Sequence, residues 1–322
     1  MTPFIQFDRV MFGYSPERLV LRDVSFSVGR GDVVAVMGGS GSGKTTLLRL
    51  LMGQEFADSG RVLIDGEDLK GFGRKKLAEF RKRMGALFQD GALFGDMTVS
   101  ENVMFPLREH TALPERALRD LAALKLRAVG LGAFGDYMPA QLSGGMARRA
   151  ALARAMALDP ELMLFDEPFS GLDPVSLGQI AELIALAGRA LRATCVMVTH
   201  DVARSLDVCS KAIFLHEGKI AFEGAPEAMR ASTSPLIAGF LSGKGGLDFA
   251  PPTTGPETEA ETEAETEAET KSAMRAPETR RRPKTAQAGP QPDSTQSLGA
   301  AQSVGPQARP DAPSPNLKEG RP

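Results

Sequence analysis

The sequence is poor in the residues that mark several classes of protein. It has two cysteines, no tryptophan, two tyrosines and three histidines among 322 residues. Cys195 and Cys209 stand in apolar or mixed stretches, so they indicate no disulfide framework; they fit a reducing compartment and predict partly buried thiols. The formal net charge of −2 lacks the basic excess of a protein that binds nucleic acid, so we expect no nucleic-acid partner.

Long apolar runs are also missing. No stretch approaches the roughly eighteen apolar residues that a membrane span needs. The first ten residues, MTPFIQFDRV, lack the charged segment and apolar core of a signal peptide. We therefore expect a cytoplasmic protein that serves any membrane process from the membrane surface.

Composition changes near Gly243. No aromatic residue follows Phe249, and a four-residue repeat, ETEA, begins at Glu257. Such a segment cannot bury enough apolar surface to offset its ordering entropy, so we predict that residues 244–322 form a disordered tail. The basic cluster at residues 280–284 could touch anionic lipid, although composition favours a solvated tail.

Residues 1–243 have the pattern of an α/β domain. Short, apolar, β-branched runs predict buried strands at Val33–Gly38, Glu161–Glu167 and Thr194–His200. Helical stretches at Met146–Leu158 and Pro174–Leu191 lie near them along the chain. Buried strands alternating with helices indicate a parallel sheet.

Two other regions have a different pattern. Residues 4–12 and 61–69 are typical of antiparallel strands and hairpins, whereas Asp90 to Asp159 is mostly helical. We therefore predict one domain over residues 1–243 that combines an α/β core, an antiparallel β subdomain and an inserted helical subdomain at about 90–159.

A phosphate-binding loop follows the first predicted strand. The run GGSGSGKT satisfies GxxxxGK[ST] and precedes an apolar helix, so backbone N–H groups and the helix N-terminus can surround phosphate oxygens. We expect Lys44 to bind the β- and γ-phosphates, the Thr45 hydroxyl to bind Mg²⁺ and Thr46 to reach the α-phosphate. A merely flexible Gly/Ser loop is the alternative that this context disfavours. The predicted ATP contacts in the loop are Gly38, Ser40, Gly41, Ser42, Gly43, Lys44, Thr45 and Thr46.

Two carboxylates close the predicted strand at Leu162–Phe165. Acids at the carboxyl end of such a strand lie beside the nucleotide. We expect Asp166 to hold Mg²⁺ through water and Glu167 to act as general base on the attacking water. The pair is weak on its own and becomes informative with the phosphate loop upstream.

The run LSGGM at residues 142–146 precedes a helix and then the carboxylate strand. With this order the sequence resembles the ABC ATPase family from Phe4 to about Gly243, which implies the P-loop NTPase fold of that family. Ser143 is expected to cap the helix.

The resemblance assigns further roles. Tyr14 matches the aromatic residue that stacks on adenine, and Gln89 the glutamine that senses Mg²⁺ and the attacking water. His200 matches the histidine that contacts the γ-phosphate. Taken alone, Tyr14 could be a turn residue and His200 a structural histidine, so their order and context carry the argument.

The resemblance also implies a dimer. In the family the signature loop meets the γ-phosphate that the other subunit holds. The chain has one phosphate loop and one signature, so two composite sites require a homodimer. The residues expected to contact ATP in trans are Ser143, Gly144, Gly145 and, in the matched D-loop, Asp173.

One position departs from the usual signature, because Met146 stands where glutamine is common. The run LSGGMARRAALARA, together with Arg81–Pro114, resembles the ATPases of the Mla systems, which serve MCE-type phospholipid transporters. This resemblance implies a membrane permease, with a small regulatory subunit and an MCE-type subunit as further partners, at the inner face of the inner membrane. The apolar residues expected to seat the permease, or else to belong to the helical core, are Leu93, Phe94, Phe105, Pro106 and Leu107.

Three alternatives remain, of which the first is still a transporter ATPase. Met146 and residues 81–114 argue against the ATPase of an importer for an amino acid or osmolyte. A soluble ABC ATPase acting on ribosomes or DNA usually has two ATPase units or a coiled-coil insertion, and the sequence has neither repeats nor sustained heptads. A purely structural P-loop protein is disfavoured by the intact Glu167 and His200.

Overall fold

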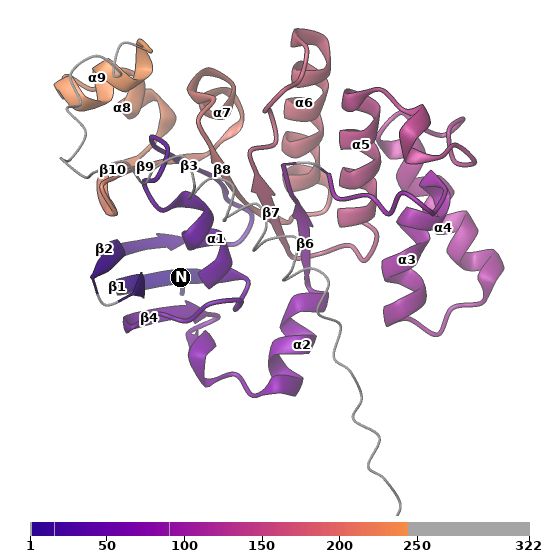
Figure 1. The fold of residues 1–322 in the computed structure, drawn as a ribbon, viewed down its shortest axis with the longest axis horizontal. Coiled ribbons are helices and arrows are strands. Elements are labelled where there is room, and N and C mark those ends of the chain that lie inside the picture. Colours follow the sequence, from indigo (N-terminus) through magenta and orange to yellow (C-terminus); the bar gives the residue numbers. More distant parts are fainter. Residues whose placement is uncertain (1, 16, 90, 244–322) are drawn as a thin grey trace, which may run out of the picture. The chain divides into compact units, whose positions relative to one another are not determined.

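The computed structural model describes residues 2–15, 17–89 and 91–243 (Figure 1). These residues belong to one compact unit, Met1–Ala250. The predicted tail at residues 244–322 lies outside the described residues, so its predicted disorder stays a prediction.

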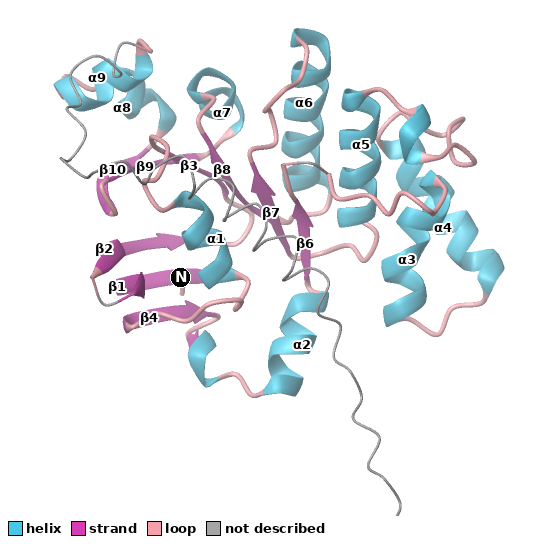
Figure 2. Cartoon of the chain, viewed as in Figure 1, coloured by secondary structure: helices cyan, strands magenta, loops and turns pink. Residues whose placement is uncertain are grey.

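A six-stranded sheet forms the centre of this unit (Figure 2). Its order is β10-β9-β3-β8-β7-β6, and every neighbouring pair is parallel except β9 with β10. The strands are β3 (Val33–Met37), β6 (Met84–Leu87), β7 (Leu162–Asp166), β8 (Thr194–Thr199), β9 (Lys211–His216) and β10 (Lys219–Gly224). The three buried strands predicted from the sequence are β3, β7 and β8, and the predicted α/β fold class is confirmed.

A second, four-stranded sheet has the order β2-β1-β4-β5. Its strands are β1 (Ile5–Ser15), β2 (Arg18–Val28), β4 (Ser59–Ile64) and β5 (Glu67–Asp68). The sheet is antiparallel, as predicted, and its buried side chains are aliphatic and aromatic. Phe7 and Phe26 are paired in the register of β1 and β2, and their rings stack with centroids 4.6 Å apart.

Nine helices complete the part of the chain that the structure describes, and two 3₁₀ turns lie at Leu69–Gly71 and Pro139–Gln141. The helices are α1 (Lys44–Leu51), α2 (Arg74–Lys82), α3 (Val99–His110), α4 (Glu115–Ala128), α5 (Gly144–Ala155), α6 (Pro174–Ala190), α7 (Val202–Val208), α8 (Pro226–Arg230) and α9 (Pro235–Leu241). Helices α3, α4 and α5 lie beside one another beyond β6 (Figure 1). None of the helices in the described ranges is long and apolar enough to cross a membrane.

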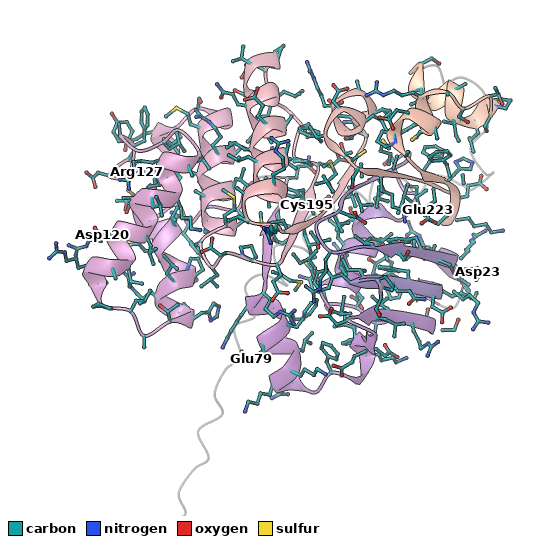
Figure 3. All side chains as sticks on the ribbon, turned by 180° about the vertical axis from the view of Figure 1, so that it is seen from behind. Asp23, Glu79, Asp120, Arg127, Cys195 and Glu223 are labelled. Carbon is teal, nitrogen blue, oxygen red and sulfur yellow. The ribbon has the colours of Figure 1, made fainter. Side chains whose placement is uncertain are left out.

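Two apolar cores hold the phosphate loop and the helical region on the same sheet. One core lies between the sheets and includes Leu47, Leu50 and Leu51 of α1. The other joins the six-stranded sheet to helices α3 to α9. Cys195 lies in this second core (Figure 3), and both cysteines are free, as predicted, and more fully buried than the sequence indicated. Burial raises the pKa of Cys195 to about 12 and that of Cys209 to about 11.

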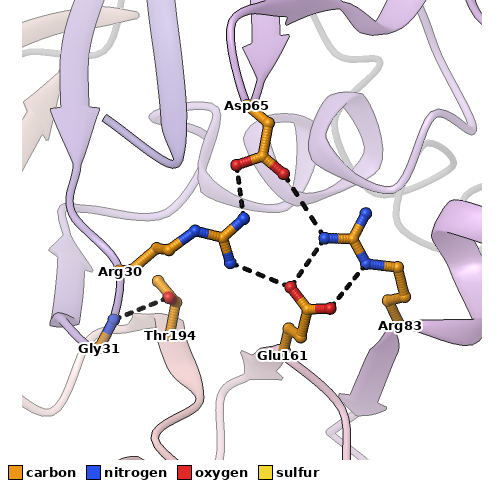
Figure 4. Close-up of polar contacts among 6 residues, drawn as sticks. All are labelled: Arg30, Gly31, Asp65, Arg83, Glu161 and Thr194. Atoms are coloured by element: carbon orange, nitrogen blue, oxygen red, sulfur yellow. Dashed lines mark hydrogen bonds and ion pairs between the residues drawn. The ribbon is translucent and has the colours of Figure 1, made fainter. Parts of the chain in front are cut away.

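A network of ion pairs ties the two sheets together just ahead of β3, β6 and β7 (Figure 4). The Glu161 carboxylate accepts hydrogen bonds from Arg83 at 2.7 and 3.0 Å and from Arg30 at 3.0 Å. Asp65 lies 2.5 Å from Arg30 and 3.5 Å from Arg83. Gly31 N donates to the Thr194 hydroxyl at 3.0 Å, which fixes the entry to β3 against β8.

Candidate nucleotide-binding site

The phosphate loop joins β3 to α1 at the carboxyl edge of the parallel sheet. The Lys44 Nζ donates to the main-chain carbonyls of Gly38 and Gly39 at 3.0 and 2.9 Å, so its side chain crosses the loop. Gly43 has a φ of +103°, and a Cβ there would lie 2.7 Å from Leu21 Cδ2. Both facts favour glycine at this position. The sequence Gly38–Lys44 therefore forms a closed turn around a central lysine.

Two groups in this loop suit a phosphate ligand. The Ser42 hydroxyl is buried and has no hydrogen-bond partner among the described residues. A buried unpaired hydroxyl costs about 1–3 kcal/mol, so an acceptor oxygen from a ligand would remove a penalty. Burial lowers the pKa of Lys44, while the nearby carboxylates of Glu167 and Asp166 oppose that shift.

The carboxylates end β7, where the sequence predicts them. Asp166 is paired with Val198 of β8, and Glu167 N donates to the Val198 carbonyl at 2.9 Å. Glu167 has a φ of +47°, in the left-handed region. Such a conformation costs on the order of 1–3 kcal/mol in a residue other than glycine and persists only where its surroundings impose it. The backbone therefore turns sharply at Glu167.

His200 follows β8 and reaches the same carboxylate. Its Nδ1 lies 2.9 Å from Glu167 Oε2, and its main-chain N–H donates to that oxygen at 3.2 Å. The His200 side chain is 65% exposed, whereas that of Glu167 is 15% exposed. The structure thus joins two predicted catalytic residues that are distant in sequence and leaves the imidazole open to a ligand.

Tyr14 lies at the end of β1 beside α1. Its ring is half exposed and packs edge-on against Phe12. Its hydroxyl lies 3.2 Å from Thr46 Oγ1 and accepts a hydrogen bond from Arg49 at 3.1 Å. These contacts fix the ring next to the phosphate loop and link it to Thr46, the predicted α-phosphate contact.

Gln89 is exposed in the turn that follows β6. The main chain after it is held by Arg154 of α5, which donates to the carbonyls of Gly91 and Ala92 at 2.9 and 2.7 Å. The same guanidinium lies 5.4 Å from the ring centre of Phe94. The sequence did not reveal this clamp, because main-chain carbonyls leave no signature in the residue types.

The signature residues begin α5. Ser143 caps the helix, as predicted, and its hydroxyl accepts from Met146 N at 3.3 Å. Gly144 is exposed, and Gly145 packs so closely that a Cβ would lie 2.3 Å from Ser176 Oγ. This contact joins the signature loop to the start of α6.

Asp173 caps α6 and accepts hydrogen bonds from Val175 N and Ser176 N, both at 3.0 Å. Hydrogen bonding from Ser176 holds the pKa of Asp173 below its usual value. Asp173 is exposed, as are Ser143 and Gly144. All three are therefore accessible to a second chain.

One residue expected to contact a permease lies instead in the core. Leu107 is only 3% exposed, because Val99, Val103 and Leu107 follow one another at four-residue spacing along the buried side of α3. The prediction of Leu107 as a docking contact is therefore wrong. Phe94 is 39% exposed and lies 4.8 Å from Phe105, centroid to centroid. Leu93, Phe105 and Pro106 are half-buried.

Comparison with known proteins fits this geometry. The family model described as ABC transporter matches residues 21–170. The chain is 49% identical over 226 residues to the intermembrane phospholipid transport system ATP-binding protein MlaF of Escherichia coli (strain K12), covering 70% of the chain and 84% of that protein. The chain belongs to the ABC transporter ATP-binding family. It is therefore an ATPase, as the sequence predicted.

Other relatives of this ABC ATPase extend the comparison. MlaF of Haemophilus influenzae is 46% identical over 228 residues, with 71% of the chain and 86% of that protein covered. A dimeric ATP-binding cassette bound to ADP and Pi has a TM-score of 0.63 at 30% identity and covers 69% of the chain and 98% of its own. The cbiO1 protein of Clostridium perfringens has a TM-score of 0.68 at 28% identity, covering 75% and 96%.

Proposed function

We propose that this ATPase is the motor subunit of a transporter that moves phospholipids between the inner and outer membranes of a Gram-negative-type envelope. The identity of 49% to a protein named for that system carries the proposal, and Met146 in the signature supports it. A relative from Mycobacterium tuberculosis (strain H37Rv) named as a probable ribonucleotide transport ATP-binding protein is 40% identical, which makes another solute the alternative.

In this proposal Lys44 and Ser42 bind the phosphate chain of ATP, and the half-exposed Tyr14 ring stacks on the adenine. The predicted magnesium residues also fit their ion. Thr45 Oγ1 and the Asp166 carboxylate provide hard oxygen ligands, which Mg²⁺ prefers. Gln89, the third predicted magnesium residue, is exposed just after β6. Mg²⁺ bound there with phosphate oxygens would neutralise charge on the phosphates.

Glu167 acts as the general base in this scheme. Its Oε2 would take a proton from the attacking water, and it is oriented by the two contacts with His200 at 2.9 and 3.2 Å. The exposed imidazole of His200 then contacts the γ-phosphate. A base held by a second group in this way keeps its carboxylate in one direction before ATP arrives.

The signature would complete the site from a second copy of the chain. Ser143, Gly144, Gly145 and Asp173 belong to two helix N-termini, which favour an anionic ligand. A homodimer with two composite sites fits the exposure of Ser143, Gly144 and Asp173, and a dimeric cassette is among the structural relatives.

The partner at the helical region would be a membrane permease seated on Leu93, Phe94, Phe105 and Pro106. An apolar surface beside the turn that contains Gln89 would respond to the nucleotide state. The subunit would then lie at the cytoplasmic face of the inner membrane, with a small regulatory subunit and an MCE-type subunit as further members of the complex.

Reconstitution with the neighbouring permease tests the substrate. We expect phospholipid to raise ATP hydrolysis, and Phe105→Asp to detach the subunit from the membrane because it places a charge against an apolar contact. Leu113→Asp, at an exposed leucine after α3, is the matched control and should leave binding intact. Stimulation by an amino acid or a nucleotide, with indifference to lipid, would contradict the phospholipid assignment.

The catalytic assignment is tested separately. Glu167→Gln keeps the shape of the side chain and removes its basicity, so hydrolysis should fall about 10²–10⁴-fold while ATP still binds. Near-normal turnover by this variant would show that another group activates the water.

A further inference from the structure

Arg148 of α5 reaches the loop that follows β7. Its Nη1 donates to the Glu167 carbonyl at 3.0 Å, and its Nη2 donates to the Ser170 carbonyl at 3.2 Å. The residue is 9% exposed. One buried guanidinium thus binds both ends of the segment that carries the proposed catalytic base.

The main chain at Glu167 needs such support. Its φ of +47° lies where side chains other than glycine are strained. The turn is closed by Ser170 N, which donates to the Glu167 carbonyl at 3.2 Å, and its entry is fixed by the bond from Glu167 N to Val198. Arg148 adds a second donor to the same carbonyl from outside the turn.

An arginine suits this position for a geometric reason. Its planar fork offers two N–H groups that point at two acceptors at once, whereas a lysine has a single nitrogen. Burying a guanidinium is costly unless its N–H groups are paired. The carbonyls of Glu167 and Ser170 provide these partners, one for each terminal nitrogen of the guanidinium.

We propose that Arg148 is a positioning residue for ATP hydrolysis: it holds the strained backbone at Glu167 so that the carboxylate stays against His200 and faces the water. It touches no reacting atom. Because Arg148 lies on the helix that Ser143 caps, it also fastens the signature helix to the base. This inference rests on the proposed role of Glu167.

A double-mutant cycle on the full-length chain tests it, with single-turnover hydrolysis measured at enzyme in excess over ATP. Arg148→Met should slow the step roughly 10- to 100-fold, because a misplaced base loses most of its advantage. The Kd for ATP should stay within about threefold, since Lys44 and Ser42 are untouched. In a Glu167→Gln background, Arg148→Met should change the rate by less than about twofold, because the base it positions is already gone.

Arg149→Met is the matched control. It lies on the same helix, but its guanidinium donates to the Val129 carbonyl at 3.0 Å beyond α4. Its hydrolysis rate should remain within about twofold of the unmodified protein, whatever happens to its melting temperature. If Arg148→Met fails to fold, Arg148→Lys serves instead, and should give a smaller loss that likewise vanishes in the Glu167→Gln background.

The outcomes separate the two assignments. An undiminished rate in Glu167→Gln would refute Glu167 as the base. A slow Glu167→Gln variant that Arg148→Met slows again by its full factor would leave the base in place and overturn the role of Arg148. A loss in Arg148→Met that appears only as weaker ATP binding would also overturn it.

Discussion

At the amino ends of β3, β6 and β7 charged side chains are paired with one another. At the carboxyl ends of these strands lie polar groups that a nucleotide would contact. Glu161, Arg83, Arg30 and Asp65 form one connected network (Figure 4). Across the sheet, the buried Ser42 hydroxyl has no partner among the described residues, and Glu167 is strained.

The difference indicates that one edge of the sheet stabilises the fold and the other binds the ligand. The network satisfies its own charges and gains nothing from a ligand. At the opposite edge, ATP could offset the desolvation of the Ser42 hydroxyl. That desolvation and the strain at Glu167 both lower the stability of the empty protein. Substitutions at the two edges should therefore separate activity from stability.

The largest effect should come from Lys44→Met at the phosphate loop. Loss of its charge should reduce kcat about 10²–10³-fold, as for removal of a group that stabilises developing charge. Burial already lowers the pKa of this lysine, so methionine should leave the melting temperature of the nucleotide-free protein equal or higher. Steady-state hydrolysis and thermal unfolding without nucleotide check both parts. A large fall in melting temperature would remove the contrast between the edges.

Arg154→Met, beside the turn that follows β6, should lower both stability and activity to an intermediate extent. The Gly91 and Ala92 carbonyls would lose a charged donor, at about 1.5–3 kcal/mol in unfolding free energy. Basal hydrolysis should fall by less than about tenfold, because Arg154 contacts the turn after β6 and makes no hydrogen bond to Glu167 among the described residues. Denaturant unfolding and basal turnover provide the measurement. Unchanged stability would mean that solvent replaces the arginine at these carbonyls.

Glu161→Gln should lower stability and leave activity unchanged, the opposite of Lys44→Met. The side chain is partly exposed, so after solvent screening we expect a loss of about 1 kcal/mol in unfolding free energy, with kcat unchanged. Glu79→Gln is the control, because Glu79 pairs only within α2 with Lys82 among the described residues and should not shift the melting temperature measurably. Equal behaviour of the two variants would show that the network acts no differently from an isolated surface pair.

The smallest effect is the pH dependence of the same network. The hydrogen bond from Arg83 holds the pKa of Glu161 below its ordinary value of 4.5. A carboxyl whose pKa is lower in the folded state stabilises the protein above the unfolded pKa and loses that contribution as pH falls through the folded one. The stability difference between the unmodified protein and Glu161→Gln should thus be constant near neutral pH and shrink below about pH 4.5. Unfolding curves from pH 3 to pH 7 measure this difference, and a difference that persisted undiminished in acid would contradict the assignment.

The sequence predicted the site residues that belong to short local sequence motifs. The phosphate loop, the Asp166–Glu167 pair and the Ser143 cap each depend on neighbours in the chain, and the structure places them on the expected elements. The alternation of buried strands with helices also predicted the sheet, because a buried parallel strand must be apolar on both faces.

The clamps formed by Arg148 and Arg154 could not be predicted in this way. Their acceptors are main-chain carbonyls from distant segments, and any residue type provides a carbonyl. The left-handed φ of Glu167 is equally hidden, because the residue type favours no such conformation. Leu107 was mispredicted for another reason: its apolar character fits a docking surface and a core alike, and only its spacing from Val103 distinguishes them.

The strand order also has a consequence for how the chain is made. Val33 of β3 pairs with Cys195 of β8, and Val34 with Lys211 of β9. A nascent chain that has left the ribosome as far as the signature has therefore synthesised its phosphate loop, but neither neighbour of the strand that supports it. The antiparallel sheet, whose strands lie between Ile5 and Asp68, can close much earlier. We expect ATP to bind late in biosynthesis, when most of residues 1–243 have emerged, and the unpaired edges of β3 to be the part of the growing chain that most needs protection from aggregation.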